Sequence, residues 1–112
     1  MRGHGLKKIL TVCEGGNVRS VGLAYALKSN GQDAVAASWR FNTKETLAML
    51  YRWADFIVVM QPEMMEHIPN RYKPKLRCID VGPDRFGSAF HPELQGIFQA
   101  HMLDWQARDF EL

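Results

Sequence analysis

The stretch KILTVCEGGNVRS, residues 8–20, is the most informative part of the chain. Its first half, from Lys8 to Cys13, is a short run rich in apolar and β-branched residues, which predicts a buried strand. Gly15 and Gly16 end that run, and residues 20–29 then carry apolar side chains at helical spacing. We therefore expect a strand, a tight turn and a helix in direct succession.

The rest of the chain continues this alternation. The pattern predicts strands at residues 34–38, 55–60 and 76–81, helices that begin at Asn42, Pro62 and His91-Pro92, and a loop from Pro69 to Pro74. Repeated alternation of strand and helix is typical of a parallel sheet with helices on both faces. The expected architecture is one α/β domain over residues 1–112, a three-layer sandwich around a four-stranded parallel sheet.

Capping and apolar spacing refine the expected helices. Asn42-Thr43-Lys44-Glu45 matches a capping box in which Asn42 is the N-cap. The predicted buried faces consist of Val21, Ala24, Leu27 and Leu23 in the first helix, and of Leu94, Ile97, Phe98, Met102 and Trp105 in the last.

Composition narrows the class of protein. Apolar residues make up 46% of the 112 residues and charged residues 23%, which suits a globular chain with a core. The net charge of +2 is too small and too evenly spread for a nucleic-acid surface. Because no long apolar stretch predicts a signal peptide or membrane span, we expect a cytoplasmic protein whose two cysteines, Cys13 and Cys78, are thiols.

The turn after the first strand combines groups that bind an anion. Consecutive amides in a glycine-containing turn, together with a helix N-terminus, form a cradle for phosphate. The expected phosphate-binding residues are Glu14, Gly15, Gly16, Asn17, Val18, Arg19 and Ser20. Arg19 adds a planar fork that matches two phosphate oxygens, and Cys13 lies at the base of the cradle, where a nucleophilic thiolate is favoured.

Residues 13–20 resemble the active-site loop of low-molecular-weight protein tyrosine phosphatases, Cys-x-Gly-Asn-x-Cys-Arg-Ser. The resemblance continues in residues 36–39 and 54–60, which are similar to two further segments of that family. It implies a flavodoxin-like, phosphotyrosine phosphatase I-like fold. It also implies that Cys13 forms a phosphocysteine, that Arg19 binds the phosphoryl oxygens, and that Ser20 donates a hydrogen bond to the thiolate.

The same family carries an Asp-Pro-Tyr/Phe-Gly segment whose Asp protonates the leaving oxygen. Asp84-Arg85-Phe86-Gly87 lies at the matching place, so the resemblance makes Asp84 the expected general acid, with Asp80 as an alternative. The chain departs from the family pattern at three positions. Gly16 occupies the place of Asn, Val18 that of the second loop cysteine, and Arg85 that of Pro.

Several other residues have a predicted place. Trp39, Phe41 and Phe86 are expected to wall the substrate pocket, together with Arg40, whereas Cys78 is expected to fill the core. Glu14 is expected to face outward and to repel a phosphate dianion mildly. The histidines show no metal-ligand spacing, so neither a metal nor a cofactor is expected.

The expected function is that of a protein tyrosine phosphatase-like phosphoric monoester hydrolase. Its partners would be a phosphotyrosine protein or peptide, or a small phosphate ester, and its product inorganic phosphate; no nucleic acid and no membrane are expected. Three alternatives stay open. One is a non-catalytic phosphate- or phosphoprotein-binding module. Another is an arsenate reductase, for which only Cys78 is available as a second thiol. A third is a phosphocarrier, against which the Arg19-Ser20 pair argues.

Overall fold

The computed structural model describes residues 6–15, 18–83 and 85–108, apart from the side chains of residues 106 and 107. The elements follow one another as β1 (Lys8–Cys13), α1 (Arg19–Ser29), β2 (Asp33–Ser38), α2 (Lys44–Trp53), β3 (Phe56–Val59), the 3-10 helices η1 (Pro62–His67) and η2 (Asn70–Lys75), β4 (Leu76–Cys78) and α3 (Pro92–Ala107). None of the helices in these ranges is long and apolar enough to cross a lipid bilayer.

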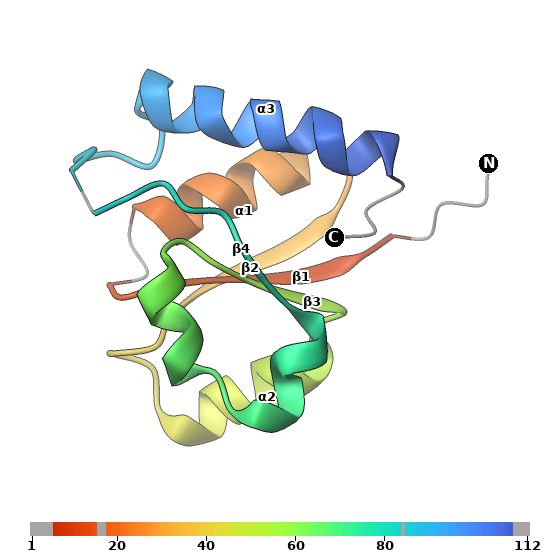
Figure 1. Ribbon diagram of the computed structural model, residues 1–112, viewed down its shortest axis with the longest axis vertical. Helices are drawn as coiled ribbons and strands as arrows, with labels where there is room; N and C mark the ends of the chain where they lie inside the picture. Colours follow the sequence, from red (N-terminus) through yellow and green to blue (C-terminus); the bar gives the residue numbers. More distant parts are fainter. Residues whose placement is uncertain (1–5, 16–17, 84, 109–112) are drawn as a thin grey trace.

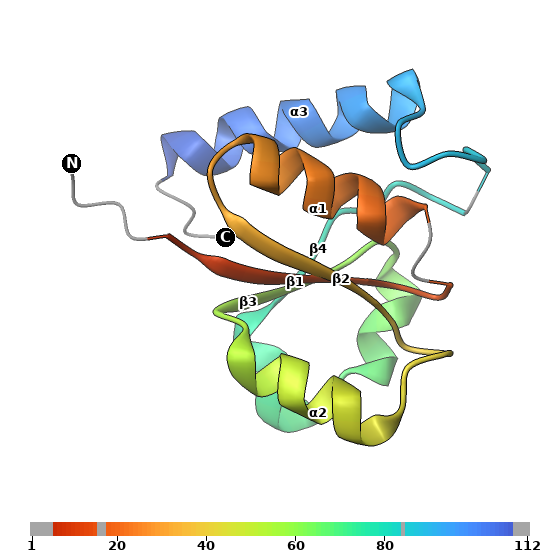
Figure 2. The same ribbon diagram turned by 180° about the vertical axis from the view of Figure 1, so that it is seen from behind.

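The four strands form one parallel sheet in the order β2-β1-β3-β4. Helices α1 and α3 cover one face of the sheet, and α2 with the two 3-10 helices covers the other (Figure 1 and, from behind, Figure 2). This arrangement confirms the predicted three-layer α/β sandwich. Because β1 is a central strand, its carboxyl end lies between those of β2 and β3, where parallel sheets bind ligands.

Three local predictions are wrong in detail. β4 ends at Cys78 rather than at residue 81, although the amide of Ile79 still donates to Val59 O (3.0 Å). Residues 70–75, expected as a loop, form η2. The N-cap of α2 is Thr43, whose side chain accepts from the amide of Thr46 (3.1 Å), while Asn42 Oδ1 accepts from the amide of Ser38 (2.7 Å).

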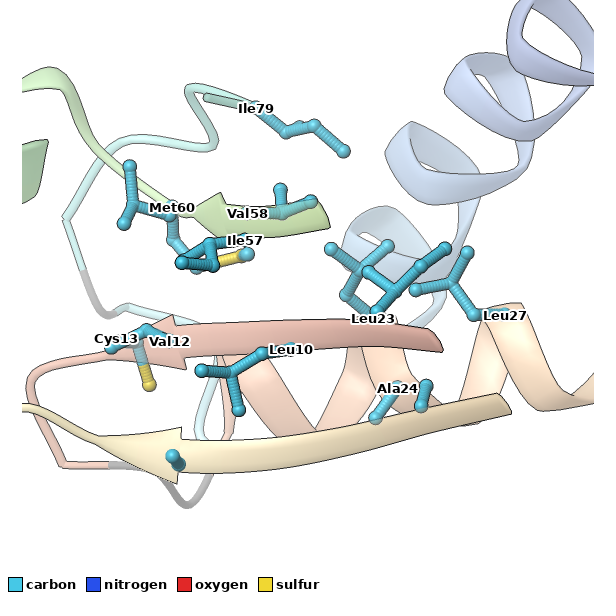
Figure 3. Close-up of a cluster of buried hydrophobic side chains, with 14 of the residues drawn as sticks. Leu10, Val12, Cys13, Leu23, Ala24, Leu27, Ile57, Val58, Met60 and Ile79 are labelled. Atoms are coloured by element: carbon cyan, nitrogen blue, oxygen red, sulfur yellow. The ribbon is translucent and has the colours of Figure 1, made fainter. Parts of the chain in front are cut away.

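The core lies on both faces of the sheet, and Figure 3 shows part of it around β1, β3 and α1. The side chains of Leu23 and Leu27, from α1, are fully buried against the sheet. Leu10 and Ile57 are register partners and are also fully buried; they point to the other face, because their neighbour Thr11 bonds to Ser20 of α1. The predicted face of α1 is shifted, because Val21 is only half-buried. The reason is that α1 packs against α3 as well as the sheet, which widens its buried face toward Gly22 and Ala26.

Candidate active site

The predicted nucleophile, Cys13, is the last residue of β1 and is 2% exposed. Figure 3 shows it beside Val12 at the margin of the core. Its Sγ lies 3.1 Å from the Oγ of Ser20, in the first turn of α1. Thr11 Oγ1 donates to the carbonyl of Ser20 (2.7 Å), which ties that turn to β1. The structure therefore brings Cys13 and Ser20 together as expected, and a serine hydroxyl at this distance is a donor to a thiolate.

Arg19 is buried, with 3% exposure, at the start of α1. Its Nη1 donates to Gln61 Oε1 (2.7 Å), just after β3, and to the carbonyl of Gly82 (2.9 Å), beyond β4. Its Nε is buried and has no hydrogen-bond partner among the described residues. A buried donor of a cationic group is costly to leave unpaired, so this edge of the guanidinium is suited to an anionic ligand.

Ser38 holds the turn that follows β2 against the start of the phosphate loop. Its hydroxyl donates to the carbonyl of Glu14 and accepts from the amides of Arg40 (3.1 Å) and Phe41 (2.8 Å). In the sheet register Ser38 stands opposite Cys13, and the next amide, that of Trp39, donates to Cys13 O (3.2 Å). The carboxyl ends of β1 and β2 are thus joined at the candidate site.

Glu14 faces outward as expected, but its charge is compensated. Its carboxylate accepts from Arg40 Nη1 at 2.7 Å, and about half of each side chain is exposed. The expected repulsion of a phosphate dianion by Glu14 is therefore offset by a cation from the neighbouring turn.

The predicted pocket walls lie in different surroundings. Phe41 is 69% exposed, and the Arg40 guanidinium lies 5.4 Å from its ring centroid. Trp39 is half-buried and stacks on His67, with ring centroids 3.6 Å apart. Phe86 is buried in the core cluster rather than on an open surface. Trp39 and Phe41 therefore remain candidates for the wall of the substrate pocket, whereas Phe86 packs in the hydrophobic core.

Some of the predicted site lies outside the described residues, namely Gly16, Asn17 and Asp84. The residue after Asp84, Arg85, forms an ion pair with Glu93 (2.6 Å), and its guanidinium carbon lies 4.3 Å from the ring centroid of Phe86. The alternative acid, Asp80, is exposed, and its Oδ1 accepts from the amide of Gly82 (3.0 Å), as is typical of a turn residue.

Cys78 is half-buried at the end of β4 and packs against the core. Burial raises the pKa of its thiol, and the charges of Asp80 and Glu63 raise it further. Such a thiol stays protonated at neutral pH, which agrees with its expected place as a core residue.

Sequence reasoning missed three residues that build this site: Thr11, Ser38 and Gln61. Thr11 and Ser38 are polar residues inside otherwise apolar strands, and that interruption was the available signal. Gln61 gave no signal, because its contact with Arg19 joins residues that are 42 positions apart.

No protein-family model matches the sequence, and a search of curated proteins finds no match. Solved structures do match the fold. The YwlE arginine phosphatase from Geobacillus stearothermophilus matches with a TM-score of 0.66 and 19% identity over 94% of this chain and 96% of that one. Vibrio vulnificus Wzb in complex with benzylphosphonate gives a TM-score of 0.68 and 19% identity over 96% and 100% of the two chains. Erwinia amylovora tyrosine phosphatase AmsI gives 0.65 and 18% identity, over 96% of each chain.

These proteins share nearly their whole length with this chain but few of its residues. The likeness therefore concerns the arrangement of strands and helices, and it confirms the flavodoxin-like fold that the sequence resemblance implied. In its architecture, the chain has the fold of these tyrosine and arginine phosphatases.

Proposed function

We propose that the protein is a phosphoric monoester hydrolase that acts through a phosphocysteine intermediate on Cys13. The observation that carries this proposal is the buried guanidinium of Arg19, whose Nε has no partner among the described residues, on the residue that precedes Ser20 and its contact with Cys13. The fold supports it, because similar solved structures are phosphatases, one in complex with benzylphosphonate and another, Wzb from Escherichia coli K30, in complex with phosphate.

In the first step the Cys13 thiolate attacks phosphorus in line with the leaving oxygen. An S–P bond forms as the P–O bond to the leaving group breaks, and Asp84 gives that oxygen its proton. Arg19 and the loop amides at residues 14–19 hold the equatorial oxygens and stabilise their charge. Since Nη1 of Arg19 is engaged by Gln61 and Gly82, its Nε edge is the one that faces the phosphoryl group.

In the second step a water molecule attacks the phosphocysteine. Asp84, now ionised, takes a proton from the water, an O–P bond forms, and the S–P bond breaks to release phosphate. The hydroxyl of Ser20, 3.1 Å from Cys13 Sγ, stabilises the departing thiolate by hydrogen bonding. No electron is gained or lost in either step.

The proposed substrates are phosphotyrosine proteins or peptides and small aryl phosphates. Trp39 and the exposed Phe41 follow β2, and the Trp39 amide donates to the Cys13 carbonyl. Their rings are therefore the proposed flanks of an aromatic leaving group.

Hydrolysis of para-nitrophenyl phosphate between about pH 5 and 8 tests the proposal. We expect turnover by the wild type, none by Cys13→Ser, and at least a hundredfold lower rate for Asp84→Ala. Cys78→Ser is the matched control and is expected to stay within twofold of the wild type.

Turnover that survives in Cys13→Ser would exclude the nucleophile. A wild type that binds phosphate or vanadate without turning over the ester would instead support the binding-module alternative.

A further inference from the structure

A hollow lies on the α2 side of the molecule, apart from the phosphate loop. It is a groove of about 350 Å³ between α2 and the segment 67–72 (the α2 groove). The apolar part of its lining includes Leu47 and the rings of Tyr51 and Tyr72, which pack at 5.3 Å between centroids. Both tyrosines are nearly buried, so the floor is preformed and rigid.

The rim of the α2 groove is cationic. Lys44 and Arg52 line it from α2, Arg71 lines it from η2, and all three are exposed. Among the described residues none of the three forms an ion pair with a carboxylate. The exposed arginines elsewhere behave differently: Arg40, Arg85 and Arg108 pair with Glu14, Glu93 and Asp104. The groove therefore keeps its positive charge for a ligand.

Other cations near the groove have structural partners. Lys75 Nζ donates to the carbonyl of Ala54 (2.6 Å), and Lys73 Nζ donates to that of Met65. These contacts attach η2 to the segments around it. The two lysines thus hold η2, which carries Arg71, beside α2, and the Arg71 guanidinium lies 5.8 Å from the ring centroid of Tyr72.

One end of the α2 groove adjoins the candidate active site. His67 lines the groove and stacks at 3.6 Å on Trp39, whose amide donates to the carbonyl of Cys13. Figure 1 shows α2 beneath the sheet, beginning on the side where β1 and β2 end. Trp39 and His67 thus link the candidate active site to one end of the groove.

We propose that the α2 groove binds an acidic segment of the peptide that carries the phosphorylated residue. Lys44 and Arg52 are eight residues apart on one helix, about 12 Å, which matches roughly four residues of extended chain. Charges spread over this length suit several carboxylates in a row better than one compact phosphate. Tyr51 and Tyr72 are only 3% and 9% exposed, so little ring surface is open for a nucleic-acid base to stack on.

The proposal rests on the proposed function, since it takes the substrate to be a phosphopeptide. The test compares phosphotyrosine peptides with four Asp or Glu residues on one side of the phosphotyrosine against peptides with Asn or Gln at those positions. The acidic run is placed N-terminally in one pair and C-terminally in the other. We expect the acidic peptide of one pair to have about tenfold higher kcat/KM, and the advantage to shrink as salt is raised.

The variant Arg52→Gln/Arg71→Gln is expected to reduce this ratio to about one. Because kcat/KM for the acidic peptide is divided by that for the neutral peptide of the same enzyme, a general loss of activity in the variant does not change this ratio. The control Lys28→Gln/Arg108→Gln removes the same charge from other surfaces and is expected to keep the tenfold ratio. A ratio near one in the wild type, or a ratio retained in the groove variant, would overturn the proposal while para-nitrophenyl phosphate turnover upholds the proposed function.

If the wild type hydrolyses neither ester nor peptide, the proposed function fails, and the groove is tested by binding alone. The probe is then the unphosphorylated acidic peptide with a fluorescent label, followed by anisotropy. Binding that Arg52→Gln/Arg71→Gln weakens tenfold would support an acidic-peptide groove. No binding, or displacement by a single-stranded oligonucleotide at lower concentration than by unlabelled peptide, would overturn it.

Discussion

Two parts of the protein's interior differ in what they bury. At the carboxyl ends of β1 and β2 lie the polar side chains that are buried in the described part of the chain: Thr11, Arg19, Ser20 and Ser38. Away from that end, the side chains buried between the sheet and the pair α1 and α3 are hydrophobic. Buried polar groups cost desolvation energy that their hydrogen bonds only partly return. The apolar part is thus expected to stabilise the fold and the polar part to serve a ligand.

The largest effect should come from the apolar part. Phe98 of α3 is fully buried, so Phe98→Ala is expected to lower the free energy of unfolding by about 3–5 kcal/mol. Chemical denaturation measures this change, and turnover per folded molecule should persist. Leu103→Ala, on the exposed face of the same helix, is the control and should stay within about 0.5 kcal/mol.

Arg19 tests the polar part. Arg19→Ala is expected to lower kcat/KM for para-nitrophenyl phosphate by about 10²–10³, because a donor to the phosphoryl oxygens is lost. Arg19→Lys keeps the charge without the planar fork and should restore only a small part of the rate. If Arg19→Ala keeps a rate within threefold of wild type, the claim that the buried polar residues serve a ligand would be contradicted.

Gly22 of α1 lies in close contact with α3 and the segment before it. A Cβ there would lie 2.7 Å from the carbonyl oxygen of Ala89 and 3.2 Å from the ring of Phe98. Gly22→Ala should therefore destabilise the protein by about 1–3 kcal/mol in thermal or chemical unfolding. Gly96→Ala, where a Cβ meets nothing within 4 Å, should instead stabilise α3 by about 0.5–1 kcal/mol. Equal changes in the free energy of unfolding for Gly22→Ala and Gly96→Ala would contradict the close packing described at Gly22.

The smallest effect concerns the exposed pair Arg85–Glu93. Hydrogen bonding to Arg85, and then its charge, lower the pKa of the Glu93 carboxyl. The pair's contribution to stability is therefore present above the pKa of Glu93 in the unfolded chain and is lost as pH falls through the lowered folded value.

In Arg85→Gln, an NMR titration should show the Glu93 pKa moving up toward its ordinary value, with no measurable change in Tm because the pair is solvent-exposed. Arg108→Gln removes a different exposed pair and should leave that titration as in the wild type. An unchanged titration in Arg85→Gln would argue against the pair in solution.

The sequence predicted best where local pattern decides structure. The strand from Lys8 to Cys13 and the helix that follows it were predicted from periodicity, and so were the positions of the other three strands along the chain. Predictions failed where a neighbour distant in the sequence decides. η2 forms where the lysine side chains of residues 73 and 75 reach the carbonyls of Met65 and Ala54.

The residues of the candidate site differ in the same way: some belong to a local motif, and others are brought close only by the fold. Cys13, Arg19 and Ser20 could be predicted together because they belong to one motif. The partners that fix Arg19 could not be predicted, because Gln61 and Gly82 are 42 and 63 positions away and only the folded sheet brings them close. The polarity of Ser38 was a signal, but its partner was not predictable, since its bond to the Glu14 carbonyl joins the ends of two strands.

Trapping the intermediate tests the central claim most directly. The wild type is mixed with para-nitrophenyl phosphate, quenched in acid within the first turnover, digested and analysed by mass spectrometry. Release of one equivalent of para-nitrophenol in a burst, with phosphate on the peptide that contains Cys13 and none on that of Cys78, is the predicted result. Steady turnover with no burst and an unmodified Cys13 would contradict it.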